Sequence, residues 1–222
     1  MKKKTQRIYA MILTALISIA MIGSGFLGYF FRGGIPPADT TNSNETANAA
    51  ADYQAQKGRI EAMVQQAKLD PGNVPLQTAL GNEYYKAGRE ALNVAPSEVQ
   101  ENYKKAVEAY QKVLKTNRDP NIILDMATSA FYSGDYDLAE KSFNEALVLK
   151  PDFINALINY GIFLSQTKQD WAGALNQWQK ALPLAQNSSD KEQIQAMISQ
   201  AQSELKTKPA ANGTSNLNPK QP

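Results

Sequence analysis

The side chains of this 222-residue chain that could do chemistry are carboxylates, lysines, hydroxyls, amides and aromatic rings, because the chain contains no Cys and no His. Their absence excludes Cys/His zinc sites, Ser-His-Asp and Cys-His catalysis, and the usual general base with a pKa near neutrality. The 21 Asp and Glu residues are scattered without the paired spacing of an acid and a base, and no Gly-rich phosphate loop follows a strand. We therefore expect no enzymatic activity, no metal and no cofactor.

The net charge of +2 depends on the N-terminus. Four basic residues lie within residues 1–7, and Arg32 follows soon after. Without these five, 18 of the 23 basic residues remain against all 21 acidic residues, so residues 33–222 carry a net charge of −3. No basic stripe is left to neutralise phosphates, which argues against nucleic-acid binding.

Residues 8–31 have the composition of a transmembrane anchor. They contain no charged side chain, and as a helix they would span about 36 Å, more than the hydrocarbon core of about 30 Å. The basic residues before this segment predict that residues 1–7 form a cytoplasmic tail and that the rest of the chain lies outside the cytoplasm. We expect a single-pass protein of the cell membrane.

A cleaved signal peptide is the alternative interpretation of this N-terminal segment. The apolar run is longer than the roughly 7–15 residues of a signal peptide, and it does not end at a small-x-small site. The sequence therefore favours an uncleaved anchor. Ala20, Ser24 and Gly28 place small side chains on one face of this helix, a spacing that would allow two anchors to pack as a homo-oligomer.

The segments on either side of the central region lack apolar bulk. Residues 32–52 are rich in Gly, Pro, Thr, Asn and Ala, and residues 207–222 in Pro, Asn and Lys. We expect a disordered linker and a disordered tail, respectively. Between them, residues 53–206 show apolar positions at intervals of three and four and no alternating strand pattern, which predicts an all-α domain.

A repeat of about 34 residues runs through the helical region. Its most regular feature is a small residue followed four positions later by an aromatic ring. The three pairs are Ala106–Tyr110, Ala139–Phe143 and Ala174–Trp178. A preceding helix carries Gly81, Ala127 or Gly161, where a partner helix must pass near the backbone. We expect Gly88 and Gly134 to end such helices as left-handed caps.

These residues resemble the tetratricopeptide repeat (TPR) family. The second repeat matches best, through Gly134, Asp135, Tyr136, Ala139, Phe143, Ala146 and Pro151. The three repeats are about 74–119, 120–153 and 154–188, the first with an insertion at 89–102 that should lengthen its helices or add a loop. Residues 53–69 should cover the first repeat. Residues 189–206 should form a capping helix on the last one, opened by a capping box at Ser189–Glu192.

The resemblance implies a superhelix of helical hairpins whose concave groove is lined by the first helix of each pair. On this basis the predicted peptide-binding residues are Asn82, Tyr85, Asp125, Thr128, Phe131, Asn155 and Asn159. Some family members hold a C-terminal carboxylate with Lys and Arg at such positions, but these positions carry no cation here. Amides and rings suit an extended or helical peptide instead.

The function predicted from the sequence is a membrane-anchored adaptor that binds a peptide segment of a protein partner in this groove. Two alternatives remain open. One is an apocytochrome c-binding assembly factor, because the layout is similar to that of membrane-anchored TPR proteins of cytochrome c maturation. The other is a self-associating structural scaffold of an envelope complex.

Overall fold

The structure, a computed structural model, describes residues 43–207. The chain divides into two compact units, Met1–Asn48 and Ala49–Pro222, and the second contains the helical domain. The predicted basic tail, the anchor at 8–31, the first part of the linker and all but the first residue of the C-terminal tail lie outside the described residues. Within the described part, no helix combines the length and the apolar character needed to cross a membrane.

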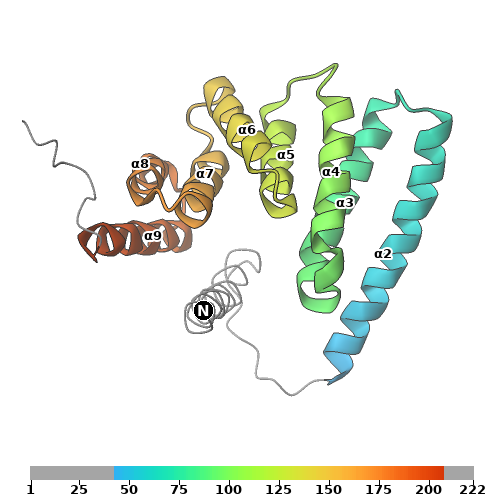
Figure 1. Ribbon diagram of the computed structural model, residues 1–222, viewed down its shortest axis with the longest axis horizontal. Helices are drawn as coiled ribbons and strands as arrows, with labels where there is room; N and C mark the ends of the chain where they lie inside the picture. Colours follow the sequence, from blue (N-terminus) through green and yellow to red (C-terminus); the bar gives the residue numbers. More distant parts are fainter. Residues whose placement is uncertain (1–42, 208–222) are drawn as a thin grey trace, which may run out of the picture. The chain divides into compact units, whose positions relative to one another are not determined.

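Every regular element in the described part of the chain is helical, which confirms the all-α prediction there (Figure 1). In chain order the elements are α2 (Ser43–Leu69), α3 (Val74–Val94), the 3₁₀ turn η1 (Pro96–Glu98), α4 (Val99–Val113), α5 (Pro120–Ser133), α6 (Tyr136–Leu149), α7 (Ile154–Thr167), α8 (Trp171–Ala181), the 3₁₀ turn η2 (Leu182–Leu184) and α9 (Ser188–Thr207). Three successive hairpins, α3–α4, α5–α6 and α7–α8, correspond to the three predicted repeats.

Side-chain caps fix where four of the six hairpin helices begin, namely α3, α5, α6 and α8. The Asn73 side chain accepts the backbone N–H of Leu76 at the start of α3. Asp135 and Asp170 cap α6 and α8 in the same way, each accepting an N–H three residues further on. Such caps satisfy backbone donors that have no partner inside the helix. At the other end of α5, Gly134 takes the left-handed conformation with φ of 88°, as expected for this position.

In the first and third hairpins a buried ring of the second helix presses against a glycine of the first helix. A Cβ atom on Gly161 would lie 2.3 Å from Nε1 of Trp178, and a Cβ on Gly81 would lie 2.5 Å from Cε1 of Tyr110. Both rings are almost fully buried. The repeat spacing therefore encodes a packing rule in which a missing side chain on one helix makes room for a ring on its partner.

Gly88 does not cap a helix, contrary to the prediction. It lies inside α3, which continues to Val94, and a Cβ there would meet the Tyr103 ring at 2.8 Å. Gly88 thus lets a ring of α4 pack closely against α3, as Gly81 does two turns earlier on the same helix. The insertion at 89–102 lengthens the first hairpin: it continues α3, forms η1 and starts α4.

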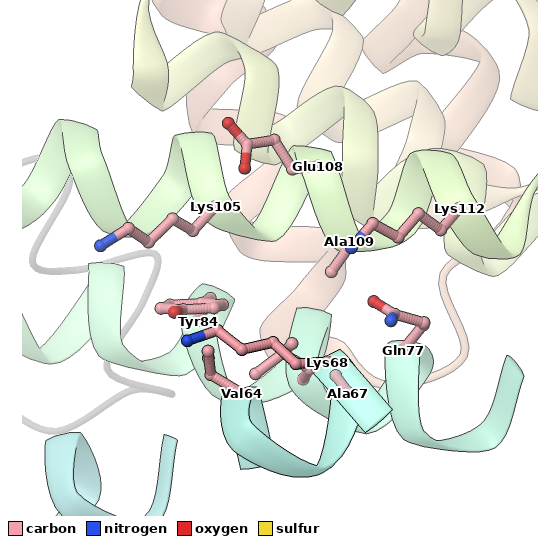
Figure 2. Close-up of a pocket in the computed structure, with 10 residues that line it drawn as sticks. Val64, Ala67, Lys68, Gln77, Tyr84, Lys105, Glu108, Ala109 and Lys112 are labelled. Carbon is pink, nitrogen blue, oxygen red and sulfur yellow. The ribbon is translucent and has the colours of Figure 1, made fainter. Parts of the chain in front are cut away.

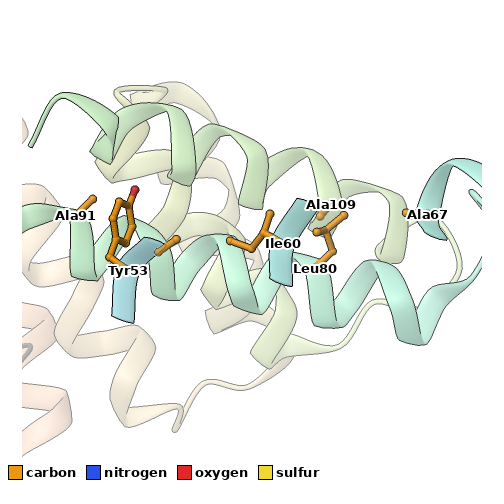
Figure 3. Close-up of a cluster of buried hydrophobic side chains, with 7 residues drawn as sticks. Tyr53, Ile60, Ala67, Leu80, Ala91 and Ala109 are labelled. Carbon is orange, nitrogen blue, oxygen red and sulfur yellow. The ribbon is translucent and has the colours of Figure 1, made fainter. Parts of the chain in front are cut away.

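Helix α2 begins at Ser43, so the last ten residues of the predicted disordered linker at 32–52 are helical. The prediction of disorder was based on the lack of large apolar side chains. The Ala-rich run 47–51 forms helix without them, because Ala has the highest intrinsic helix propensity. Further along, α2 contributes to a buried cluster with α3 and α4 (Figure 3). The cluster contains Tyr53, Ile60, Ala67, Leu80, Ala87, Ala91 and Ala109.

Polar contacts attach α2 to the inserted segment. The Tyr53 hydroxyl donates to Glu98 at 2.9 Å and accepts from the Asn102 amide at 2.7 Å, while Lys57 donates to both Glu98 oxygens. We call Tyr53, Lys57, Glu98 and Asn102 the α2 clasp. Because Glu98 and Asn102 belong to the insertion, the insertion provides the polar part of the docking site of α2.

Helix α9 covers the last hairpin with Ile194, Met197, Ile198 and Ala201, all of which are buried. Its cap lies two positions before the predicted box. The residue that accepts the Asp190 N–H is Asn187, and its amide donates back to the Asp190 carboxylate at 2.9 Å. The arrangement is similar to a capping box, but the Asp190 carboxylate accepts the side-chain amide of Asn187 in place of its backbone N–H.

Candidate functional site

The seven predicted peptide-binding residues lie on the first helices of the three hairpins. Asn82 and Tyr85 belong to α3, whereas Asp125, Thr128 and Phe131 belong to α5, and Asn155 and Asn159 to α7. Four of them, Asn82, Tyr85, Asp125 and Asn159, form what we call the carboxylate strip.

On α3, the buried core positions the two strip residues. The Tyr110 hydroxyl crosses from α4 and donates to the Asn82 carbonyl oxygen at 2.9 Å. This leaves the exposed Asn82 with its NH₂ group free to donate to a ligand. Tyr85 is partly buried, and its ring meets Tyr103 edge to face with centroids 5.7 Å apart. Both side chains are therefore held in place by α4.

Asp125 is a carboxylate without a partner. Among the described residues, no side chain forms a hydrogen bond or ion pair with it. Burial, assisted by the negative charge of Asp119, raises the pKa of Asp125 to about 6. Burial raises the pKa of Tyr85 to about 12, and Asp125 adds to this shift. Asp125 therefore lies near Tyr85, so α3 and α5 contribute to one polar surface.

Thr128 is not available to a ligand, contrary to the prediction. Its side chain is only 3% exposed, and its hydroxyl donates to the Leu124 carbonyl one turn earlier. The same oxygen accepts the Asn159 amide at 3.3 Å. The family resemblance placed Thr128 in the groove, but Asn159 of α7 covers it. Its role is to hold Asn159, which joins α7 to the strip.

Phe131 belongs to an aromatic cluster between α5, α6 and α7. Its ring stands edge to face with Phe163 at 5.7 Å and lies 4.8 Å from Tyr132, centroid to centroid. The ring is partly buried, so one part of it is open to contact. Asn155 is exposed near the start of α7 and forms no side-chain hydrogen bond with the described residues.

Sequence reasoning missed three residues next to the strip. Tyr103 and Tyr132 stack with ring centroids 5.0 Å apart. Arg89 is close enough to Tyr85, Tyr103 and Tyr132 for its charge to oppose the effect of burial on their pKa values. Arg89 lies in the insertion, where the repeat pattern assigns no positions, and Tyr103 directly follows the insertion. Arg89 lies four residues after Tyr85, on the same face of α3. This spacing is the signal in the sequence that could have identified Arg89.

A second surface lies where α2, α3 and α4 meet (Figure 2). It is a pocket of about 270 Å³ whose rim carries Lys68 of α2 and Lys105 and Lys112 of α4. We call it the lysine pocket. Its apolar lining includes Leu80 and Ala109, which also belong to the buried cluster of the three helices. The repeat pattern gave no indication of it, because α2 lies outside the repeats.

Neither surface carries a cluster of metal ligands. In the segment 43–207, no group of three or more acidic side chains is placed to hold a metal ion. The chemistry that the two surfaces do offer is recognition: one unpaired carboxylate with amides and a phenol ring on the first, and lysines around an apolar hollow on the second.

No protein-family model and no curated protein matches the chain. Solved structures that resemble it include that of the MamA protein, at 14% identity over 72% of this chain and 86% of MamA, with a TM-score of 0.48. PilW, described as a widely conserved type IV pilus biogenesis factor, matches at 15% identity over 77% of this chain and 94% of PilW, with a TM-score of 0.38. The pilF protein of Pseudomonas aeruginosa matches at 12% identity over 74% and 93%, with a TM-score of 0.37. These similarities are too distant to transfer a function.

Proposed function

We propose that this protein is an adaptor that binds an extended segment of a partner protein along the carboxylate strip, and that the segment carries a Lys or Arg opposite Asp125. The observation that supports this most directly is the missing partner of Asp125. A partly buried carboxylate without a counter-charge is unfavourable, and a cation from outside would relieve it. The neighbouring Tyr85 ring offers a face on which the same cation can rest.

The rest of the strip suits a peptide backbone. Asn82 has its NH₂ group free because Tyr110 occupies its oxygen, and Asn159 is oriented by Thr128. Side-chain amides pair with the N–H and C=O groups of an extended chain. Since these groups are already held by neighbouring helices, little ordering of the adaptor is required on binding.

We further propose that residues 8–31 anchor the adaptor in the cell membrane with residues 43–207 outside the cytoplasm. The support for this is the uncharged apolar sequence and the basic residues before it. Anchoring would confine the strip near membrane-bound partners and raise their effective concentration.

Site-specific photo-crosslinking in intact membranes tests the proposal. A photoreactive phenylalanine analogue at Asn155, beside the strip, should crosslink to a partner segment that contains Lys or Arg, and Asp125→Asn should reduce the yield severalfold. Val148 on α6, which is 79% exposed, is the matched control and should give no such product. Equal yields from both positions, or a captured segment without a cation, would refute the strip as the binding surface.

The same experiment separates the two alternatives. Recovery of a c-type apocytochrome would identify the partner class and support the cytochrome c maturation role. Crosslinks only between copies of the chain that survive Asp125→Asn would instead favour the self-associating scaffold.

A further inference from the structure

The lysine pocket has an excess of positive charge. Among its charged lining residues, Lys68, Lys105 and Lys112 outnumber Glu108 by three to one. Figure 2 shows Lys105 and Lys112 on α4 at one side of the hollow and Lys68 on α2 at the other. Lys112 forms no ion pair or hydrogen bond with the described residues, and Lys68 contacts only the neutral Gln65, at 3.4 Å. Two of the three cations thus lack a counter-charge.

The pocket also contains a buried acceptor without a donor. Gln77 is 1% exposed, and its amide nitrogen donates to the Pro71 carbonyl at 3.3 Å. Its Oε1 atom has no hydrogen-bond partner among the described residues. A buried acceptor left unpaired costs about 1–3 kcal/mol. A ligand with an N–H group could satisfy it, since Gln77 lines the pocket.

The lysine pocket also offers apolar surface to a ligand. Val64, Leu80 and Ala109 contribute from α2, α3 and α4, respectively, and the Tyr84 ring lies beside them with Lys105 5.7 Å from its centroid. The ligand must therefore combine an apolar group, a negative charge and an N–H donor. A short peptide segment with Asp or Glu beside an aliphatic residue has all three.

We propose that the lysine pocket is a second protein-binding site, which takes an acidic segment of a partner protein. An aliphatic side chain of the segment packs against Leu80 and Ala109, its carboxylate lies among the three lysines, and a backbone N–H reaches Oε1 of Gln77. The site is separate from the carboxylate strip. Gln77 and Asn82 are five residues apart on α3, which places them about 140° apart around the helix.

A random peptide library displayed on phage, selected against the full chain in mild detergent, tests this proposal. The peptides recovered should include a group with Asp or Glu beside Leu, Ile, Val or Met. Binding of this group should fall at least tenfold for the double variant Lys68→Gln/Lys112→Gln. Lys180→Gln/Lys191→Gln, two exposed lysines on α8 and α9, is the matched control and should leave binding unchanged.

A second variant examines the buried acceptor. Gln77→Met removes the acceptor while keeping the length of the side chain, and it should weaken the binding of the acidic peptides. Asp125→Asn should not affect them, whereas it should weaken basic peptides that bind the strip, so the two proposals fail independently. The inference is wrong if no acidic-aliphatic group is recovered, or if such peptides bind the Lys68→Gln/Lys112→Gln variant as well as the parent chain.

Discussion

The two sides of α3 differ in charge and in how they are built. On one side, Asn82 and Tyr85 meet α5 at a carboxylate, and hydrogen bonds and ring contacts from α4 hold them in place. On the other, Gln77 and Leu80 face a hollow closed by α2 and surrounded by lysines. The first surface is made by the repeat itself, whereas the second needs a helix from outside the repeat. One scaffold helix can therefore offer recognition sites of opposite charge.

The largest effect is expected from Gly81→Ala, which would disturb both surfaces together. The added Cβ would lie 2.5 Å from the Tyr110 ring, and overpacking of this kind lowers the free energy of unfolding by about 1–3 kcal/mol. Tyr110 holds Asn82 of the carboxylate strip, and its helix α4 also lines the lysine pocket. Peptides that bind the strip and peptides that bind the pocket should therefore both bind more weakly. Chemical denaturation measures the change in stability.

Gly58→Ala on α2 is the matched control for that substitution. Nothing lies within 4 Å of a Cβ at Gly58, so the change should increase stability by up to about 1 kcal/mol through helix propensity alone. Equal destabilisation by the two substitutions would show that the close contact at Gly81 does not exist.

Asp125→Asn should separate the two surfaces. Loss of the carboxylate should weaken a Lys- or Arg-containing strip ligand about tenfold, or about 1.4 kcal/mol. Acidic ligands of the lysine pocket should keep their affinity. Titration of both kinds of peptide into the parent chain and the variant, followed by calorimetry, measures the difference. Parallel losses for both would show that the surfaces are not independent.

Stability should depend on pH through Asp125. Its pKa is about 6 in the folded chain, above the ordinary value of 3.8. Between these values the folded chain retains a proton that the unfolded chain has lost, so the free energy of unfolding should decrease as the pH rises from about 4 to about 6, by about 2 kcal/mol. Thermal melts of the parent chain and Asp125→Asn check this, because the variant should lack this contribution. A strip ligand that carries a cation should bind more weakly as the pH falls through about 6.

The smallest effect should come from the α2 clasp. Hydrogen bonds from Lys57 and Tyr53 hold the pKa of Glu98 below its usual range, yet the Lys57–Glu98 pair is exposed, so Glu98→Gln should cost under about 1 kcal/mol. Amide exchange in α2 should accelerate and acidic peptides should bind the pocket more weakly, while the strip remains unchanged. Glu101→Gln, which removes the exposed pair with Lys105, is the control and should leave exchange in α2 as it is.

The repeat features were predictable because each is a local rule. Spacing placed Tyr110 and Trp178 in the core, and Asp135 and Gly134 at helix ends, where the structure has them. Gly88 was misassigned because a glycine that allows a left-handed cap and one that accommodates a ring look identical in sequence. The structure, rather than the spacing, reveals the Tyr103 ring against it.

For the candidate site, the sequence could predict which helix face a residue occupies but not which neighbouring side chains cover that face. The family resemblance put Thr128 in the groove, but it could not show that Asn159 would cover it. The lysine pocket was beyond prediction, because Lys68 and Lys112 are brought together by the docking of α2. That docking depends on contacts such as Tyr53–Asn102, which are 49 residues apart and follow no repeat.

The central claim is that the Asp125 carboxylate receives a cation from a partner segment. Carbon-13 NMR of the Asp125 side-chain carboxyl, titrated with acid in the full chain, tests it directly. The account predicts a pKa of about 6 for the free chain and a decrease of at least about one unit when a strip-selected peptide containing Lys or Arg saturates it. A pKa that stays the same on saturation would contradict the account.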